Sequence, residues 1–458
     1  MTGTEQTEQS EASLARRPLT RRGFVAGALG VGAAVFATGS AGVLSGCAPS
    51  EDQHSEDLVT KASNDKDIDT LKVSADQVTD ATDFERMPFE DYLKLQTTLD
   101  LPLGSLVYQM DSSFALVLLP GETGKSLRAI GMLNLATGVL ASVLSGPVGT
   151  SKNVVLYDAR ASQNALIWVE FDLGNHHWST YVASLGGIVS SAAPAASAAE
   201  GEAAEAAEGE AITASVTVGE PRLVEEGDAD YEPPMLAVAP QKLYWTVMPV
   251  ATGPANQQDS LFRALSLERD GAPYTGEPYT VLASHGRMIT NPLVSNGIVT
   301  FVPRVDTGNI YYQLTALDCA SDKLVDFRIL PQSVKVADAL YANGTFFFSI
   351  EGDYSYAEGL SKFGMYLELE DGTYLRVGRT PVCPAVRFGD CLVIQSTANI
   401  VGFDLVQKKS FVIESPPLSP KFGEALVGWG VQDKVVTSSV RLSEDGSVGE
   451  ATTVRVFA

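Results

Sequence analysis

The sequence is poor in basic residues, histidine and cysteine. Only 32 Lys and Arg stand against 56 Asp and Glu in 458 residues, which gives a formal net charge of −24. A surface this acidic lacks the cations that neutralise nucleic-acid phosphates, and it also argues against electrostatic adsorption on anionic lipid. We therefore expect no nucleic-acid partner, and we interpret the charge mainly as a solubilising surface.

Four cysteines are too few for a fold that is stapled by disulfides. Cys47 belongs to a processing motif described below, which leaves Cys319, Cys383 and Cys391. The last two either form a disulfide or stay as buried thiols. A hairpin turning at residues 388–389 would not set them directly opposite each other, so buried thiols are the favoured interpretation.

Motifs for catalysis and metal binding are present only in incomplete form. His176 and His177 are adjacent, so on a strand they face opposite sides and cannot easily share a metal ion, and His285 stands alone. Residues 121–126 have the glycines and lysine of a phosphate-binding loop, but Leu119 occupies the place of its first glycine. We expect no catalytic set, no metal ligand set and no cofactor.

The longest uncharged stretch follows a pair of arginines near the N-terminus. Arg21 and Arg22 come after Thr20 and before Phe24, and residues 24–44 carry no charge and are rich in Gly and Ala. Such a run is only mildly hydrophobic and is typical of a cleavable signal rather than of a membrane span. The pattern resembles the twin-arginine export signal, which implies the twin-arginine translocase as a partner and a route known for carrying folded proteins.

The uncharged stretch ends in Leu44, Ser45, Gly46 and Cys47. This sequence resembles the lipobox of bacterial lipoproteins, in which processing enzymes attach a diacylglyceryl group to the cysteine and cut the chain just before it. The resemblance implies that two acyl chains hold the mature protein on the extracytoplasmic face of the bacterial cell membrane. A plain transmembrane anchor is the alternative, and it would need nothing special at Cys47.

Composition divides the chain into three parts. Residues 1–46 form the predicted signal peptide, and residues 47–83, rich in Ser, Thr, Asp and Glu, are expected to be a flexible acidic tether. Residues 84–458 make up the globular domain. Within it, residues 190–232 begin with a stretch of Ala, Glu, Gly and Ser, and we interpret them as a low-complexity insert.

The globular part consists of short apolar runs separated by Gly, Asn and Asp turns, a pattern typical of β-strands. One such run recurs about every 45–55 residues, with a longer gap at the insert. We interpret each run as an inner strand, and in most cases a strand–turn–strand pair follows it. The seven runs are Phe114–Leu119, Ala165–Phe171, Lys242–Met248, Gly297–Pro303, Thr345–Ile350, Asp390–Ser396 and Lys434–Ser438.

A repeat of this length resembles the blade of a β-propeller, although the sequence carries no signature of a named repeat family. The resemblance implies an all-β fold, most simply a ring of seven four-stranded blades. Six or eight blades, or a pair of two-sheet sandwiches, are the alternatives. Thr452–Phe457 is expected to be the last strand, with Leu106–Gln109 as its partner in closing the ring. A short amphipathic helix is expected at Pro88–Gln96.

The loop after the fifth apolar run is aromatic. Tyr354, Tyr356 and Phe363 lie in it, and Tyr-rich loops make good contact surfaces, although packing on a neighbouring blade is an equal alternative. We expect a membrane-anchored module that binds or scaffolds an envelope protein, peptide or glycan. The alternatives are a propeller enzyme, either a polysaccharide lyase or hydrolase or a quinone-cofactor oxidoreductase, and a purely structural assembly lipoprotein. Fold alone does not choose among them.

Overall fold

The computed structural model describes residues 58–121, 126–189, 215–250, 258–267, 276–378, 381–396, 399–419 and 423–458. Contacts divide the chain into two units, Met1–Pro49 and Ser50–Ala458, and every described residue belongs to the second unit. The predicted export signal, the lipobox with Cys47 and residues 190–214 of the predicted insert lie outside the described residues. Among the residues described, no helix is long and apolar enough to cross a membrane.

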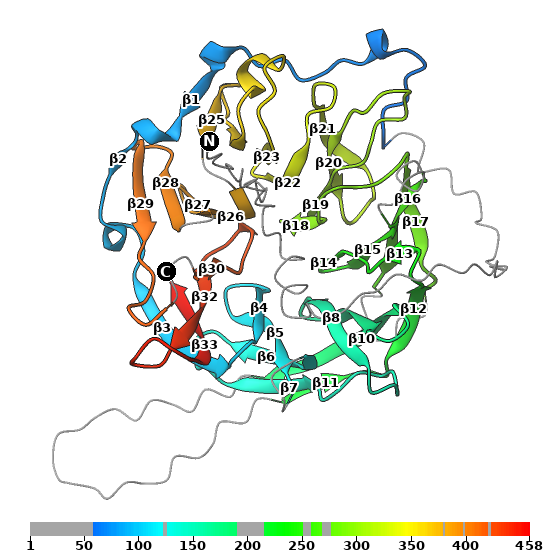
Figure 1. Ribbon diagram of the computed structural model, residues 1–458, viewed down its shortest axis with the longest axis vertical. Helices are drawn as coiled ribbons and strands as arrows, with labels where there is room; N and C mark the ends of the chain where they lie inside the picture. The colour runs from blue at the N-terminus through cyan, green and yellow to red at the C-terminus, as the bar shows by residue number, and fades with distance from the viewer. Residues whose placement is uncertain are drawn as a thin grey trace, which may run out of the picture. The chain divides into compact units, whose positions relative to one another are not determined.

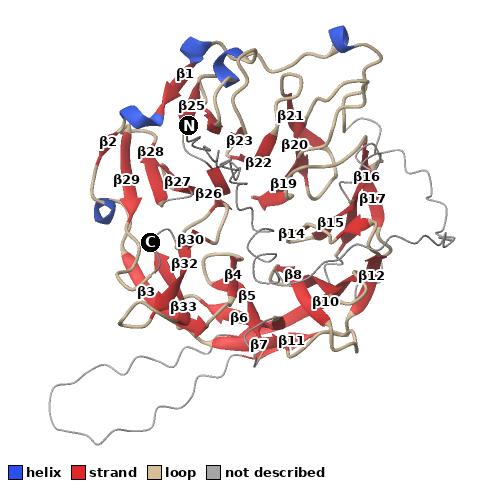
Figure 2. Cartoon of the chain, viewed as in Figure 1, coloured by secondary structure: helices blue, strands red, loops and turns tan. Residues whose placement is uncertain are grey.

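The described chain is all-β apart from short 3-10 helices, as the sequence predicts (Figure 2). Its strands form seven sheets, which we number in chain order.

Sheet 1 contains β4 (Leu106–Gln109), β5 (Phe114–Pro120), β6 (Leu127–Asn134) and β7 (Leu140–Leu144). Sheet 2 contains β8 (Val154–Ala161), β9 (Ala165–Asp172), β10 (Trp178–Val189), β11 (Ser215–Val218) and β12 (Arg222–Gly227). Sheet 3 contains β13 (Tyr231–Glu232), β14 (Leu236–Ala239), β15 (Lys242–Pro249), β16 (Ser260–Ser266) and β17 (Tyr279–Ser284). Sheet 4 contains β18 (Leu293–Ser295), β19 (Ile298–Phe301), β20 (Gln313–Asp318) and β21 (Leu324–Ile329).

Sheet 5 contains β22 (Val336–Ala342), β23 (Thr345–Ile350), β24 (Gly364–Glu368), β25 (Tyr374–Val377) and β1 (Val78–Asp80). Sheet 6 contains β26 (Pro381–Phe388), β27 (Cys391–Ser396), β28 (Ile400–Asp404), β29 (Lys409–Ile413), β2 (Glu85–Arg86) and β31 (Gly430–Val431). Sheet 7 contains β30 (Ala425–Leu426), β32 (Val435–Leu442), β33 (Gly449–Phe457) and β3 (Leu95–Pro102). The 3-10 helices are η2 (Asp65–Asp67), η3 (Ala75–Gln77), η4 (Ala81–Asp83), η5 (Phe89–Asp91) and η7 (Glu358–Leu360).

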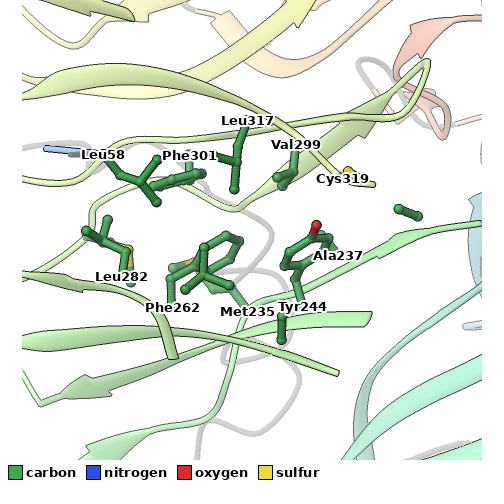
Figure 3. Packing of buried hydrophobic residues seen from close by; sticks show 14 of the residues in the cluster. Leu58, Met235, Ala237, Tyr244, Phe262, Leu282, Val299, Phe301, Leu317 and Cys319 are labelled. Carbon is green, nitrogen blue, oxygen red and sulfur yellow. The ribbon is translucent and has the colours of Figure 1, made fainter. Parts of the chain in front are cut away.

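The sheets follow one another around a ring, which is a β-propeller arrangement (Figure 1). A buried apolar cluster lies between each sheet and the next, and the last cluster joins Val107 of sheet 1 to Val436 and Val454 of sheet 7. Figure 3 shows the cluster between sheets 3 and 4, where the ring of Phe262 lies 4.6 Å from that of Phe301. Because every sheet buries both faces, the ring has no exposed sheet face to protect.

The seven apolar runs that we predicted as inner strands are all second strands. They correspond to β5, β9, β15, β19, β23, β27 and β32, each with a shorter or less uniformly buried strand before it. In β9, for example, Ala165–Val169 is fully buried, whereas two of the three residues of β18 are only half-buried. A second strand packs against sheets on both faces, so its sequence is the most uniformly apolar. The first strand lines the channel and was therefore missed.

Both ends of the chain build sheet 7, but the predicted partner strand is wrong. β33 pairs along its length with β3, from Leu95 opposite Phe457 to Pro102 opposite Ala451. Leu106–Gln109 is instead β4, the first strand of sheet 1. The helix predicted for Pro88–Gln96 is also wrong, because only η5 is helical and β3 begins inside that range.

The structure differs from the predicted tether over residues 58–83, the part that it describes. Leu58 and Val73 are buried in the clusters of sheets 3 to 5, and β1 pairs in parallel with β25. This N-terminal segment, residues 58–102, runs along the outer edges of sheets 4, 5, 6 and 7 and is drawn in blue and light blue in Figure 1. The spaced apolar residues of this segment are buried against the ring, and this burial offsets the entropy cost of ordering the segment. The tether prediction considered the entropy cost without this burial.

The alternation of strand direction gives the ring two faces. Residues near the ends of β4, β8, β14 and β18 line one cavity, so these first strands run in the same direction. The turns from first to second strands and those from third to fourth strands lie on what we call the upper face. Loops from second to third strands, and those joining one sheet to the next, lie on the lower face.

Candidate binding site in the channel

A cavity of about 70 Å³ lies in the channel near the upper face. The residues that line it come from the first strands of four sheets, from the turn after β4, from the second strand β5 and from the segment that leads into β32. They are Tyr108, Gln109, Met110, Leu116, Arg160, Ala161, Val238, Val294, Trp429 and Gln432. The cavity therefore exists only because the ring brings together residues that lie more than 300 positions apart in sequence.

The channel is crossed by residues 427–432, which we call the channel segment. Its short strand β31 pairs in parallel with β26, on the channel side of sheet 6. The backbone N–H of Gln109 in sheet 1 donates to the carbonyl of Val427 at 3.0 Å. On the far side, Trp429 donates its indole N–H to the carbonyl of Val294 in sheet 4 at 3.1 Å. One segment thus bridges three sheets.

Two glycines allow the channel segment to approach its neighbours this closely. A Cβ at Gly428 would lie 2.1 Å from the side-chain oxygen of Gln109. Gly430 has a φ of +73°, and a Cβ there would lie 2.6 Å from the hydroxyl of Ser295. Any larger residue would clash at both positions and would be strained at the second.

Arg160 is the charged residue of the cavity. Its guanidinium lies 4.0 Å from the ring centroid of Tyr108 and 5.7 Å from that of Trp429, within the range of cation–π attraction. It also donates to the carboxylate of Asp158, and its side chain is only 12% exposed. Burial works to lower the pKa of Arg160, but Asp158 and Tyr108 outweigh it, so the pKa is raised and the charge is permanent.

Gln109 connects the cavity wall to the channel segment. Its side-chain N–H donates to the amide oxygen of Gln432 at 3.2 Å and to the carbonyl of Lys434 at 3.2 Å. Its own amide oxygen is buried and has no hydrogen-bond partner among the described residues. This oxygen lies against Gly428, where an added Cβ would be 2.1 Å away, so the missing donor is a local cost of packing the channel segment this closely.

The arrangement suits the binding of one polar or aromatic group. Trp, Tyr and Arg are the residue types that dominate binding hot spots, because they combine a large apolar surface with polar tips. Small-molecule pockets usually measure about 300–1,000 Å³. A cavity of about 70 Å³ is therefore suited to a single inserted group rather than to a whole small molecule.

The predicted loop residues do not lie at this cavity. Tyr354, Tyr356 and Phe363 follow a second strand and therefore belong to the lower face. Tyr354 packs against the cluster between sheets 4 and 5 and accepts a hydrogen bond from the backbone of Lys335 at 3.1 Å. Tyr356 is 58% exposed and donates to the carbonyl of Gln332 at 2.8 Å. The loop is therefore partly packed and partly exposed, and its role as a contact surface stays a prediction.

The cysteines and histidines form no site in the described part of the chain. No group of three or more His, Cys, Asp or Glu side chains there is placed to hold a metal ion. Cys319 and Cys391 are free, buried thiols, and burial raises their pKa to about 12 and about 11. The side chain of Cys383 lies outside the described residues.

Sequence reasoning missed Arg160 and Trp429. Arg160 lies near the end of β8, and no motif in the neighbouring sequence indicates a functional residue there. The sequence Gly428-Trp429-Gly430 is a signal that was available, since a large aromatic between two glycines indicates a close backbone approach around an anchored ring.

Comparison with known proteins identifies no family. No family model matches the chain, and no curated protein matches it. Solved structures that resemble it include the β-propeller domain of the trilobed protease from Pyrococcus furiosus, at 10% identity and a TM-score of 0.38, covering 64% of this chain and 79% of that one. Another is the acylaminoacyl peptidase of Pyrococcus horikoshii, at 9% identity and a TM-score of 0.40, covering 78% of this chain and 51% of that one. A third is Raptor from Chaetomium thermophilum, at 8% identity and a TM-score of 0.40, covering 82% and 29%. The chain thus spans about half or less of the last two proteins.

Proposed function

We propose that the protein is a lipid-anchored, extracytoplasmic seven-bladed propeller that binds an envelope protein, peptide or glycan at its channel cavity. The twin-arginine pattern around Arg21 and Arg22 and the lipobox ending at Cys47 support the location. The seven sheets support the blade count if each sheet is one blade, with additional short strands on sheets 2, 3, 5 and 6. On this proposal the translocase and the lipoprotein-processing enzymes are transient partners, and the envelope ligand is the lasting one.

The observation that carries the binding role is the position of Arg160 within cation–π distance of two aromatic rings. The guanidinium is held by Tyr108, Trp429 and Asp158 before any partner arrives. A rigid anchor site of this kind lowers the entropy cost of association, because its side chains are already ordered. A partner that inserts one group beside Trp429 fits this geometry.

Affinity capture of the lipidated protein from its own membrane tests the proposal. We expect wild-type protein to recover a specific partner. The Trp429→Ala variant should recover at least about tenfold less of that partner, which is a typical loss at a binding hot spot. Val406→Ala is the matched control, because Val406 lies on the upper face, is 71% exposed and does not line the cavity. Mass analysis of the same samples checks for the diacylglyceryl group on Cys47.

Two outcomes would contradict the proposal. Equal recovery of the partner by Trp429→Ala and wild type would remove the cavity from the binding role. Recovery of no partner, together with turnover of an envelope glycan by the purified protein, would favour the enzyme alternative instead. Thermal midpoints of both variants, measured in parallel, separate lost binding from lost folding.

A further inference from the structure

Exposed apolar side chains gather on the lower face. Thirteen large apolar residues are exposed in the described part of the chain, and eight of them lie in lower-face loops. These are Leu103, Val148, Leu173, Ile310, Tyr356, Phe363, Leu418 and Val448. Two lie at the upper face, Val406 and Leu95, and the other three are on outer strands. They come from seven different loops around the ring, so a surface that contacts the whole lower face would meet several of them at once.

The described chain also begins on the lower face. Leu58 and Val59 are buried between sheets 3 and 4, beside Met235 and Met288, which belong to lower-face loops. Gln313, at the lower-face end of β20, holds the backbone of residues 58–60. Its side chain donates to the carbonyl of Leu58 at 2.8 Å and accepts from the N–H of Thr60 at 3.0 Å. Residues 58–60 are therefore held at the lower face by packing and by two hydrogen bonds.

Chain length limits how far Leu58 can lie from the proposed lipid. Ten residues separate Cys47 from Leu58, and the eleven steps along the chain, at about 3.6 Å each, span at most roughly 40 Å. We infer that the lower face docks on the lipid bilayer, with Ile310, Tyr356 and their apolar neighbours at the membrane interface. This inference rests on the proposed lipidation of Cys47 and goes beyond it by fixing the orientation of the ring.

The chemistry of the face indicates which kind of bilayer it contacts. Its loops carry many carboxylates, among them Asp228, Asp230, Asp353 and Asp445, so anionic headgroups repel it. Tyr356 and Phe363 are amphipathic or aromatic side chains of the type that membrane interfaces favour. Docking is therefore driven by apolar contact and by the acyl chains, and it is favoured on zwitterionic lipid and insensitive to salt.

The orientation has a consequence for the channel cavity. Trp429 and Arg160 lie near the upper face, at the end of the channel that then points away from the bilayer. A partner in the extracytoplasmic space reaches them without displacing the protein from its membrane.

Spin labels on the two faces test this orientation. The full-length lipidated protein is reconstituted in phosphatidylcholine vesicles with one added cysteine, Tyr356→Cys or Ile310→Cys on the lower face, or Val406→Cys on the upper face as the matched control. Wild type supplies the background from its native cysteines. Collision with oxygen is compared with collision with a water-soluble nickel chelate. We expect both lower-face labels to show a several-fold lower nickel-to-oxygen ratio than the Val406 label. Leu173→Cys replaces either lower-face variant that does not fold.

The possible results separate this inference from the proposed function. Equal ratios at all three positions, with the lipid on Cys47 confirmed by mass, would overturn the docking and leave the anchor in place. If the lower-face labels were protected from the nickel chelate in the absence of vesicles, and more so at higher protein concentration, the lower face would contact a second copy of the chain. This result would also overturn the docking on the bilayer. A chain with no lipid on Cys47 overturns the proposed function and the orientation together.

Discussion

Two segments add to the regular strands of the sheets, one outside the ring and one inside it, and they are held by different means. The N-terminal segment, residues 58–102, extends sheets 5 and 6 through β1 and β2 and supplies β3, the outermost of the four strands of sheet 7. Backbone pairing of this kind accepts most side chains, so the sequence needs only a few apolar residues at intervals, such as Leu58, Val73 and Leu93.

The channel segment, residues 427–432, has only a two-residue strand. Besides its backbone bonds to β26 and Gln109, it depends on single side chains: the indole of Trp429, the hydroxyl of Ser295, which accepts from the N–H of Val431 at 3.2 Å, and two glycines. The outer segment is therefore tolerant of substitution except at its buried apolar positions, whereas the inner one is sensitive at nearly every residue.

The largest effect is expected from Leu93→Ala in the outer segment. Leu93 is fully buried between sheets 6 and 7, beside Phe411 and Phe457. Its truncation removes contacts and leaves a cavity, so the free energy of unfolding should fall by about 2–5 kcal/mol. The midpoint of denaturant unfolding measures this loss.

Leu103→Ala is the matched control, because the same substitution at a residue that is 40% exposed should change stability by less than about 0.5 kcal/mol. Equal midpoints for the two variants would mean that the N-terminal segment is not part of the cooperative fold.

An intermediate effect is expected from Gly430→Ala in the channel segment. The alanine Cβ would lie 2.6 Å from the hydroxyl of Ser295 at a φ of +73°, so strain and overpacking together should lower stability by about 1–3 kcal/mol. Because the segment also carries Trp429, we expect partner capture to fall more steeply than the unfolding midpoint.

Gly446→Ala separates the two causes. Gly446 has nearly the same φ of +72°, but nothing lies within 4 Å of its added Cβ. The difference between the stability losses of Gly430→Ala and Gly446→Ala measures the cost of the contact with Ser295 alone. If the two variants lose equal stability and bind the partner equally, the packing of the channel segment has no role in the site.

The two segments also show where sequence reasoning reaches its limit. The second strand of every sheet was predictable, because burial on both faces leaves a continuous apolar run such as Ala165–Val169. The outer segment was missed because its apolar residues are sparse and acquire a partner only when the ring exists. The site was missed for a stronger reason: Arg160 and Trp429 lie 269 positions apart, and no local pattern records their contact.

The smallest effect is expected from Asp80→Asn, which tests a polar attachment of the outer segment. Burial works to raise the pKa of Asp80, but its hydrogen bonds from Arg376 and from the N–H of Thr82 outweigh it and hold the pKa below its usual 3.8. A carboxylate with a depressed pKa stabilises the fold above its unfolded value and loses that contribution as the pH falls through the folded value.

The wild-type thermal midpoint should therefore fall more steeply than that of Asp80→Asn as the pH drops below about 3.8, since the amide does not titrate. Arg376→Met is the companion variant, because removing the cation should flatten the same part of the curve. Parallel curves for all three proteins would show that β1 is held to sheet 5 by its backbone pairing alone. The outer segment would then differ even more sharply from the channel segment, whose backbone pairing with β26 is supplemented by the side chains of Trp429 and Ser295.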